Sequence, residues 1–245
     1  MPPLTTRMLC PPFVVPVARN GIRPMRSANP VVDATIPVEA NRGAGPGSGG
    51  EELREVELAA GNNLEASGVH VALLRGINVG GKNKLPMKEL AAMFADVGAG
   101  DVQTYIQSGN VAFRAQAALA ELLPAAVTSA IAKLFGFEVP VVMRTAEELR
   151  KVATGNPFLL AGADESALHV AFLMKKPGPA EISALDPGRF PPDELELHGR
   201  EIYLRCPSGI ARTRLTTAYF DSKLGTTSTV RNWRTVLKMA EMSGA

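Results

Sequence analysis

The sequence predicts an α+β protein whose two halves share one order of elements, with a C-terminal helix at the end and a disordered leader in front. From Val69 onward, apolar residues alternate between the spacing typical of strands and the spacing typical of helices. The order strand, helix, hairpin, helix, strand occurs twice. The opening strands also share letters, since His70–Leu74 reads HVALL and His169–Leu173 reads HVAFL. We therefore expect two ferredoxin-like βαββαβ halves, over residues 69–146 and 147–245.

Residues 1–66 differ in composition from the rest of the chain. Prolines recur through this segment, and Gly43–Gly50 consists almost entirely of small residues. Such a segment buries too little apolar surface to offset its ordering entropy. We expect a disordered leader, or an N-terminal extension from a start codon assigned too far upstream. A transit peptide is the alternative, because only basic charges precede Asp33, the first acidic residue; they are Arg7, Arg19, Arg23 and Arg26.

The first half contains a strong hairpin signal at Ser108-Gly109-Asn110. Pro124 lies either in the first turn of the second helix or at a kink within it. In chain order, the predicted elements are a strand over Val69–Leu74, a helix over Met87–Val97, strands over Val102–Ile106 and Val111–Phe113, a helix over Leu119–Leu134 and a strand over Val139–Met143.

A linking helix over Thr145–Ala153 opens the second half, with Thr145 and Glu148 spaced as a capping box. A closing helix carries Trp233, Val236, Leu237 and Ala240 on one face. Between these helices, the predicted elements are a strand over Leu168–Met174, a helix over Pro179–Leu185, strands over Leu195–Leu197 and Ile202–Leu204, a helix over Leu215–Leu224 and a strand over Thr226–Val230.

Composition narrows the classes of partner. The formal net charge is only +2, so a nucleic-acid or membrane role would have to rest on local clusters of charge. No apolar run approaches the ~18 residues of a transmembrane helix, and we expect no membrane partner. Cys10 and Cys206 form no disulfide framework, which favours the cytoplasm. His70 and His169 lack a third ligand at metal-binding spacing, so we expect no metal and no cofactor. The oligomeric state stays open.

Three motifs carry a family resemblance. They are the runs Val71–Lys84, with the letters VALLRGINVGGKNK, Thr104–Val111, with TYIQSGNV, and Arg231–Lys238, with RNWRTVLK. Together they resemble bacterial proteins grouped as domain of unknown function 1697, from about Val69 to Met242. The resemblance implies two ferredoxin-like halves and carries no established activity. The chain departs from the family at Ala211–Thr216, where a usual Gly-Arg-Ser-Lys-Leu-Thr-like run reads ARTRLT, which keeps the basic character and removes the lysine amine.

A first candidate site lies at one end of the first half. The first two strands of a βαββαβ half run in the same direction, so the loop after the first strand should meet the hairpin after the second. Backbone N–H groups of such a Gly-rich loop can form a nest for an anion. The alternative is a long connecting loop whose glycines permit positive φ. The candidate ligand-binding residues are Arg75, Asn78, Gly80, Gly81, Lys82, Lys84, Ser108 and Asn110.

A second candidate site gathers basic residues of the second half. Its third and fourth strands end at the same edge, so Arg212, Arg214, Arg231 and Asn232 should converge there. Arg212 and Arg214 also precede a helix, whose N-terminus favours a bound anion. The alternative is that these arginines are solvated or pair with neighbours such as Asp221.

Other chemistries find less support. Gly76–Asn83 fits the phosphate-binding pattern GxxxxGK, but Asn83 stands where a hydroxyl should hold magnesium. Cys206 has no basic partner in sequence, and aromatic residues are too few for an RNA-recognition sheet. Two functions remain: binding of a phosphorylated or other anionic small molecule by both clusters, or a nucleic-acid or protein binding module that uses the basic edge of the second half. The sequence assigns no reaction, which leaves open whether the protein is an enzyme.

Overall fold

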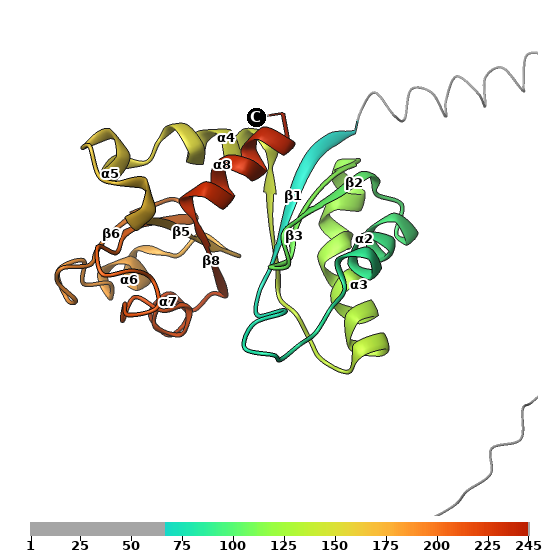
Figure 1. Cartoon of the computed structure of the whole chain (residues 1–245), viewed down its shortest axis with the longest axis horizontal. Coiled ribbons are helices and arrows are strands. Elements are labelled where there is room, and N and C mark those ends of the chain that lie inside the picture. The colour runs from blue at the N-terminus through green and yellow to red at the C-terminus, as the bar shows by residue number, and fades with distance from the viewer. Residues whose placement is uncertain (1–66, 245) are drawn as a thin grey trace, which may run out of the picture. The chain divides into compact units, whose positions relative to one another are not determined.

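Two four-stranded antiparallel sheets form the framework of the computed structural model, which describes residues 67–244 (Figure 1). The predicted disordered leader, residues 1–66, lies outside the described residues. In the first sheet the strand order is β2-β3-β1-β4, and in the second it is β6-β7-β5-β8. The strands are β1 (Gly68–Leu74), β2 (Gly100–Tyr105), β3 (Asn110–Ala115), β4 (Val141–Thr145), β5 (Leu168–Leu173), β6 (Glu194–His198), β7 (Glu201–Arg205) and β8 (Ser228–Asn232).

Two helices cover the outer face of the first sheet, α2 (Met87–Asp96) and α3 (Ala117–Phe135). Their apolar faces bury Phe94 and Leu123 against Phe113 of β3, in one continuous core. Pro124 lies inside α3 rather than in its first turn, because the helix begins at Ala117. Among residues 67–244, α3 alone is long and apolar enough to cross a membrane by length and composition. Its buried side chains, Ala120, Leu123, Val127 and Ile131, face the sheet.

The outer face of the second sheet carries α6 (Pro179–Ser183) and α7 (Thr217–Leu224), which enclose a second core around Phe220. Helix α7 starts two residues later than the periodicity predicts. The reason is local, because the Thr216 hydroxyl accepts a hydrogen bond from the backbone N–H of Tyr219 and so caps the helix at that point. Two short elements, α5 (Pro157–Leu160) and η1 (Glu165–Ala167), precede β5 in the second half.

A third core lies between the two sheets. Helices α4 (Ala146–Thr154) and α8 (Trp233–Met242) pack against each other over it, at the same edge of both sheets (Figure 1). The predicted capping box of α4, from Thr145 and Glu148, is confirmed. On α8, Leu237 is exposed instead of buried, and the inward face carries Trp233, Val236, Met239 and Ala240. Residues of both halves therefore pack together in this third core.

Candidate functional site

The Gly-rich loop after β1 is held in place by two asparagine side chains. The Asn78 amide donates to the carbonyl oxygens of Leu85 and Gln107, both at 2.8 Å, and its own oxygen accepts from the Leu85 N–H at 2.8 Å. Asn83 donates to the Gly76 carbonyl at 3.0 Å. The loop and the β2–β3 turn thus lie side by side, as the topology predicts. Both amides serve to shape the loop.

Arg231 on β8 points across the boundary between the halves and is only 8% exposed. All five of its N–H groups have acceptors, and every acceptor is uncharged. Nε donates to Asn110 Oδ1 (2.5 Å), Nη1 to Thr229 Oγ1 (2.7 Å) and the Val230 carbonyl (2.9 Å), and Nη2 to the carbonyls of Leu74 (2.6 Å) and Ser108 (3.0 Å). Arg231 therefore ties β8 to the end of β1 and to the β2–β3 turn.

The charge of Arg231 is not balanced by an acid. No carboxylate of residues 67–244 forms an ion pair with it. Burial lowers the pKa of its guanidinium to about 10, which leaves the group charged at neutral pH. A shift of that size corresponds to about 3 kcal/mol of unfavourable burial. An anion placed nearby would recover part of that free energy.

Arg144 on β4 makes the reciprocal contact in the other direction. It stands opposite Val71 of β1, just as Arg231 stands opposite Val170 of β5. Its Nη2 donates to the carbonyls of Leu173 (2.9 Å) and Arg200 (3.0 Å), at the corresponding strand end and hairpin.

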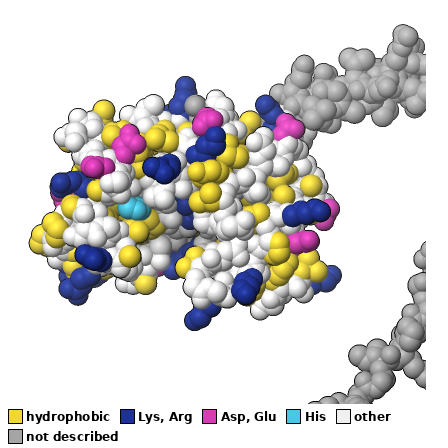
Figure 2. Space-filling model, viewed as in Figure 1, with side chains coloured by type: hydrophobic (Ala, Val, Ile, Leu, Met, Phe, Trp, Pro, Cys, Tyr) yellow, Lys and Arg dark blue, Asp and Glu magenta, His cyan; other side chains and the backbone are white. Residues whose placement is uncertain are grey.

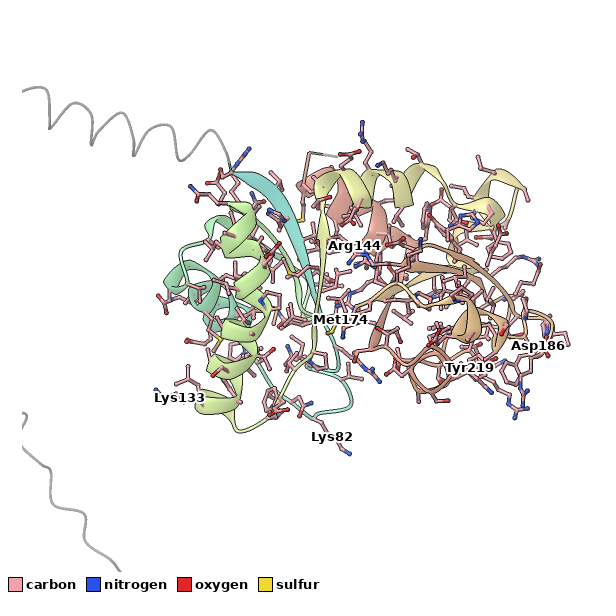
Figure 3. All side chains as sticks on the ribbon, turned by 180° about the vertical axis from the view of Figure 1, so that it is seen from behind. Lys82, Lys133, Arg144, Met174, Asp186 and Tyr219 are labelled. Atoms are coloured by element: carbon pink, nitrogen blue, oxygen red, sulfur yellow. The ribbon has the colours of Figure 1, made fainter. Side chains whose placement is uncertain are left out.

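The two arginines differ in their counter-charges. Arg144 Nε lies 2.7 Å from Glu201 Oε1, where Arg231 has the neutral Asn110. Burial lowers the pKa of Arg144, and the Glu201 carboxylate opposes that effect. Figure 3 shows Arg144 at the boundary between the halves. One side of this boundary is thus electrically balanced, and the Arg231 side carries an excess positive charge.

A cavity of about 400 Å³ opens beside Arg231. Arg75 enters it from the end of β1, and its guanidinium bonds to Asp221 and, at 3.2 Å, to Thr217 Oγ1. These bonds use one N–H on each terminal nitrogen and leave three further N–H groups of Arg75 without a partner among the described residues. The cavity is lined by Leu74, Arg75, Gly76, Ile77, Val79, Ile106, Ser108, Thr217, Thr229, Val230, Arg231, Asn232 and Thr235.

Four of the predicted site residues line this cavity: Arg75, Ser108, Arg231 and Asn232. Asn110 lies behind Arg231 and bonds to it. The remaining residues of the first cluster, Asn78, Gly80, Gly81, Lys82 and Lys84, belong to the loop but not to the cavity lining. Lys82 extends outward from the loop tip in Figure 3.

The four residues of the second cluster do not converge on one site in the structure, so that prediction is wrong. Arg231 turns to the inner face of its sheet, toward the first half. Arg214 stacks 4.9 Å from the ring centre of Phe190, which packs in the core on the outer face. Arg212 is exposed and does not line the cavity. The sequence did not single out the hydroxyls of Thr217, Thr229 and Thr235, which line the cavity. Thr229 could have been predicted, because it lies two residues before Arg231 and shares its face of the strand.

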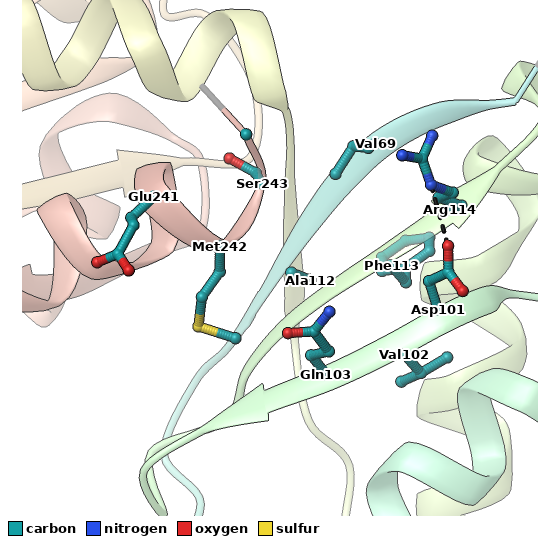
Figure 4. A pocket seen from close by; sticks show the side chains of 11 residues that line it. Val69, Asp101, Val102, Gln103, Ala112, Phe113, Arg114, Glu241, Met242 and Ser243 are labelled. Carbon is teal, nitrogen blue, oxygen red and sulfur yellow. Dashed lines mark ion pairs between the residues drawn. The ribbon is translucent and has the colours of Figure 1, made fainter.

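Two other features lack the chemistry of a binding or catalytic site. A cavity of about 440 Å³ beside the end of α8 holds Arg114, but this arginine already pairs with Asp101 at 3.0 Å (Figure 4). Cys206 is buried, and burial raises the pKa of its thiol to about 11, which makes it a poor nucleophile at neutral pH. Neither feature offers an unbalanced charge or a reactive group.

Comparison with known proteins places the chain in a family. The family model described as "Protein of unknown function (DUF1697)" matches residues 68–203. The chain belongs to this family. A solved structure described as conserved bacterial protein SP0830 from Streptococcus pneumoniae aligns with a TM-score of 0.56 at 22% identity, over 73% of this chain and 99% of that one. That similarity concerns the fold alone. The search of curated proteins gives no match. The matched family segment includes Arg75 and Asn110 and ends before Arg231.

Proposed function

We propose that this DUF1697 protein binds a small anionic molecule, such as a phosphate ester or a carboxylate, in the cavity that contains Arg75 and Arg231. The observation that carries the proposal is the buried guanidinium of Arg231, which has five hydrogen bonds and no counter-anion among residues 67–244. Buried charges in proteins are normally paired. A bound anion would supply the missing charge.

Arg231 and Arg75 would contribute to anion binding in different ways. Arg231 attracts an anion through its charge, since its N–H groups are all in use. Arg75 has N–H groups to spare and can bond to the anion directly. The hydroxyls of Ser108 and Thr217 line the same cavity and add neutral donors. Small-molecule sites are usually lined by apolar side chains with a few placed polar groups of this kind.

We also infer that each half is a ferredoxin-like unit and that the halves arose by internal duplication. The strand orders β2-β3-β1-β4 and β6-β7-β5-β8 support this, as does the reciprocal pair Arg144 and Arg231. If the halves arose by duplication, the surroundings of Arg144 and of Arg231 were once alike. The acidic partner Glu201 on one side and Asn110 on the other then mark a divergence of function.

The alternative of a nucleic-acid binding surface finds less support. Basic side chains on the face shown in Figure 2 are separated from one another and form no continuous stripe. Along the edge of the second half, Arg205 pairs with Glu194 and Arg200 pairs with Glu148. A polyanion would have to displace these carboxylates.

Isothermal titration calorimetry of the full chain with inorganic phosphate, phenyl phosphate and benzoate tests the proposal. We expect at least one of these anions to bind, and Arg75→Met to weaken that binding by roughly tenfold or more, equivalent to about 1.4 kcal/mol. Lys82→Met removes a nearby cation outside the cavity and serves as the matched control. Equal losses in both variants, or no binding of any of the three anions, would overturn the proposed site.

A further inference from the structure

Two exposed apolar side chains stand at the cavity beside its basic groups. Val79 is 64% exposed and Ile106 is 51% exposed, and both line the cavity. Exposed apolar side chains scattered singly need no explanation. Here, however, two come from separate segments, the Gly-rich loop and the β2–β3 turn, and meet at one cavity. That placement gives the cavity an apolar wall in addition to its charge.

The backbone of Ile106 is in an unfavourable conformation. Its φ is +48°, in the left-handed region that β-branched residues avoid. Neighbouring amides fix the chain on both sides of it, because Asn110 donates to the Tyr105 carbonyl at 3.1 Å and Asn78 donates to the Gln107 carbonyl at 2.8 Å. An asparagine or glycine would relieve the strain at this position. The sequence instead keeps an exposed isoleucine there, and strain of this kind is typical of ligand-binding segments.

Val79 is presented in a similar way. It lies between Asn78 and Gly80, which both have positive φ, and its carbonyl accepts from the Lys82 N–H at 3.1 Å to close a tight turn. The side chain is left outside any core of the described residues. A ligand in the cavity is therefore the group that can bury both Val79 and Ile106.

The size and charge of the cavity limit the ligand further. About 400 Å³ is near the lower end of the range for small-molecule sites, which is roughly 300–1,000 Å³. Arg75 is the one arginine of the cavity lining with N–H groups to spare. This arrangement matches a ligand with a single anionic group.

Building on the anion site proposed above, we infer that the ligand is amphipathic: one anionic group at Arg75 and Arg231, joined to a compact apolar group that packs against Val79 and Ile106. Binding would bury the apolar wall and balance the charge together. Inorganic anions and polyanions would each satisfy only part of this surface.

Calorimetric titration of the full chain with inorganic phosphate and phenyl phosphate, at one pH and salt concentration, tests the inference. Phenyl phosphate should bind at least tenfold more tightly. Ile106→Asn and Val79→Ser should bring the ratio of the two affinities toward one. Asparagine tolerates positive φ, so Ile106→Asn should melt at or above the temperature of the parent protein, and loss of binding through unfolding is thereby controlled.

Leu122→Ser removes an exposed apolar side chain on α3, away from the cavity, and is the matched control that should keep the ratio. Equal affinities for the two anions in the parent protein, or a ratio that survives both cavity variants, would overturn the amphipathic ligand while leaving the anion site standing. Absence of binding by either anion would overturn the amphipathic ligand, and absence of benzoate binding as well would overturn the anion site.

Discussion

Replacing Arg231 by methionine should destabilise the protein markedly, because it removes the hydrogen bonds that connect β8 to the first half. Methionine fills much of the volume of the arginine stem without its charge. Three acceptors of the first half lose their donor: Asn110 Oδ1 and the carbonyls of Leu74 and Ser108. The change therefore tests whether these bonds hold the halves together.

The expected magnitude follows from two opposing effects. A buried acceptor without a partner costs about 2 kcal/mol, so three of them cost roughly 6 kcal/mol. Removing the buried charge recovers about 3 kcal/mol, from the pKa of about 10 for Arg231. The net loss is roughly 3 kcal/mol, which lowers the melting temperature by about 6–12 °C in a folded region of this size.

Chemical denaturation and thermal melting of the full chain measure this loss. Arg234→Met is the matched control, since Arg234 is an exposed arginine on α8 that forms no ion pair or hydrogen bond with the described part of the chain. It should change stability by less than about 0.5 kcal/mol. If Arg231→Met were as stable as Arg234→Met, the five hydrogen bonds would do no more than offset the cost of burying the charge. The claim that Arg231 stabilises the contact between the halves would then be refuted.

Three further changes have defined outcomes. Gly109→Ala should lower the free energy of unfolding by roughly 2–4 kcal/mol in denaturant titrations, because φ is +72° and the new Cβ would lie 2.6 Å from Leu74 Cβ; a neutral change would mean that the turn can shift. Burial lowers the pKa of His169, so the unfolded chain takes up its proton first and stability should fall as pH drops below about 6.5; His169→Gln should reduce the difference in stability between pH 7.5 and pH 5.5, and an unchanged difference would contradict this. With its thiol pKa raised to about 11, Cys206 in a Cys10→Ser background should react with a thiol reagent at pH 8 far more slowly in the native than in the denatured protein, and equal rates would refute its burial.

The order of elements could be predicted from the sequence because it depends on local periodicity. The residues at which strands begin and end were harder to predict. The run Thr226–Val230 is β-branched enough to predict a strand, but β8 spans Ser228–Asn232. That shift of two residues matters, since it places Arg231 inside the strand. A residue inside a strand has a defined face, whereas the sequence placed Arg231 in a loop beyond the strand, with no defined direction.

The site depends on how the halves dock, and that information is not local. Arg75 and Asp221 meet although 146 positions separate them, and Arg231 and Asn110 are 121 positions apart. The sequence does bring Arg75, Ser108 and Asn110 to one end of the first half through topology alone. It cannot distinguish an amide that binds a ligand from one that shapes a loop, and Asn78 is the second kind.

The affinity of phenyl phosphate for Asp221→Asn, measured by calorimetry beside the parent protein, tests the anion site at Arg75 and Arg231 most directly. Asp221 holds Arg75 by its charge, and its Oδ1 accepts from Ser228 N–H at 2.8 Å, a bond that an asparagine oxygen can also accept. The variant should fold, free the charge of Arg75 and add to the excess positive charge of the cavity. We predict that affinity rises roughly threefold to tenfold, or about 0.7–1.4 kcal/mol. Unchanged or weaker binding in a variant of parental stability would contradict an anion site at Arg75 and Arg231.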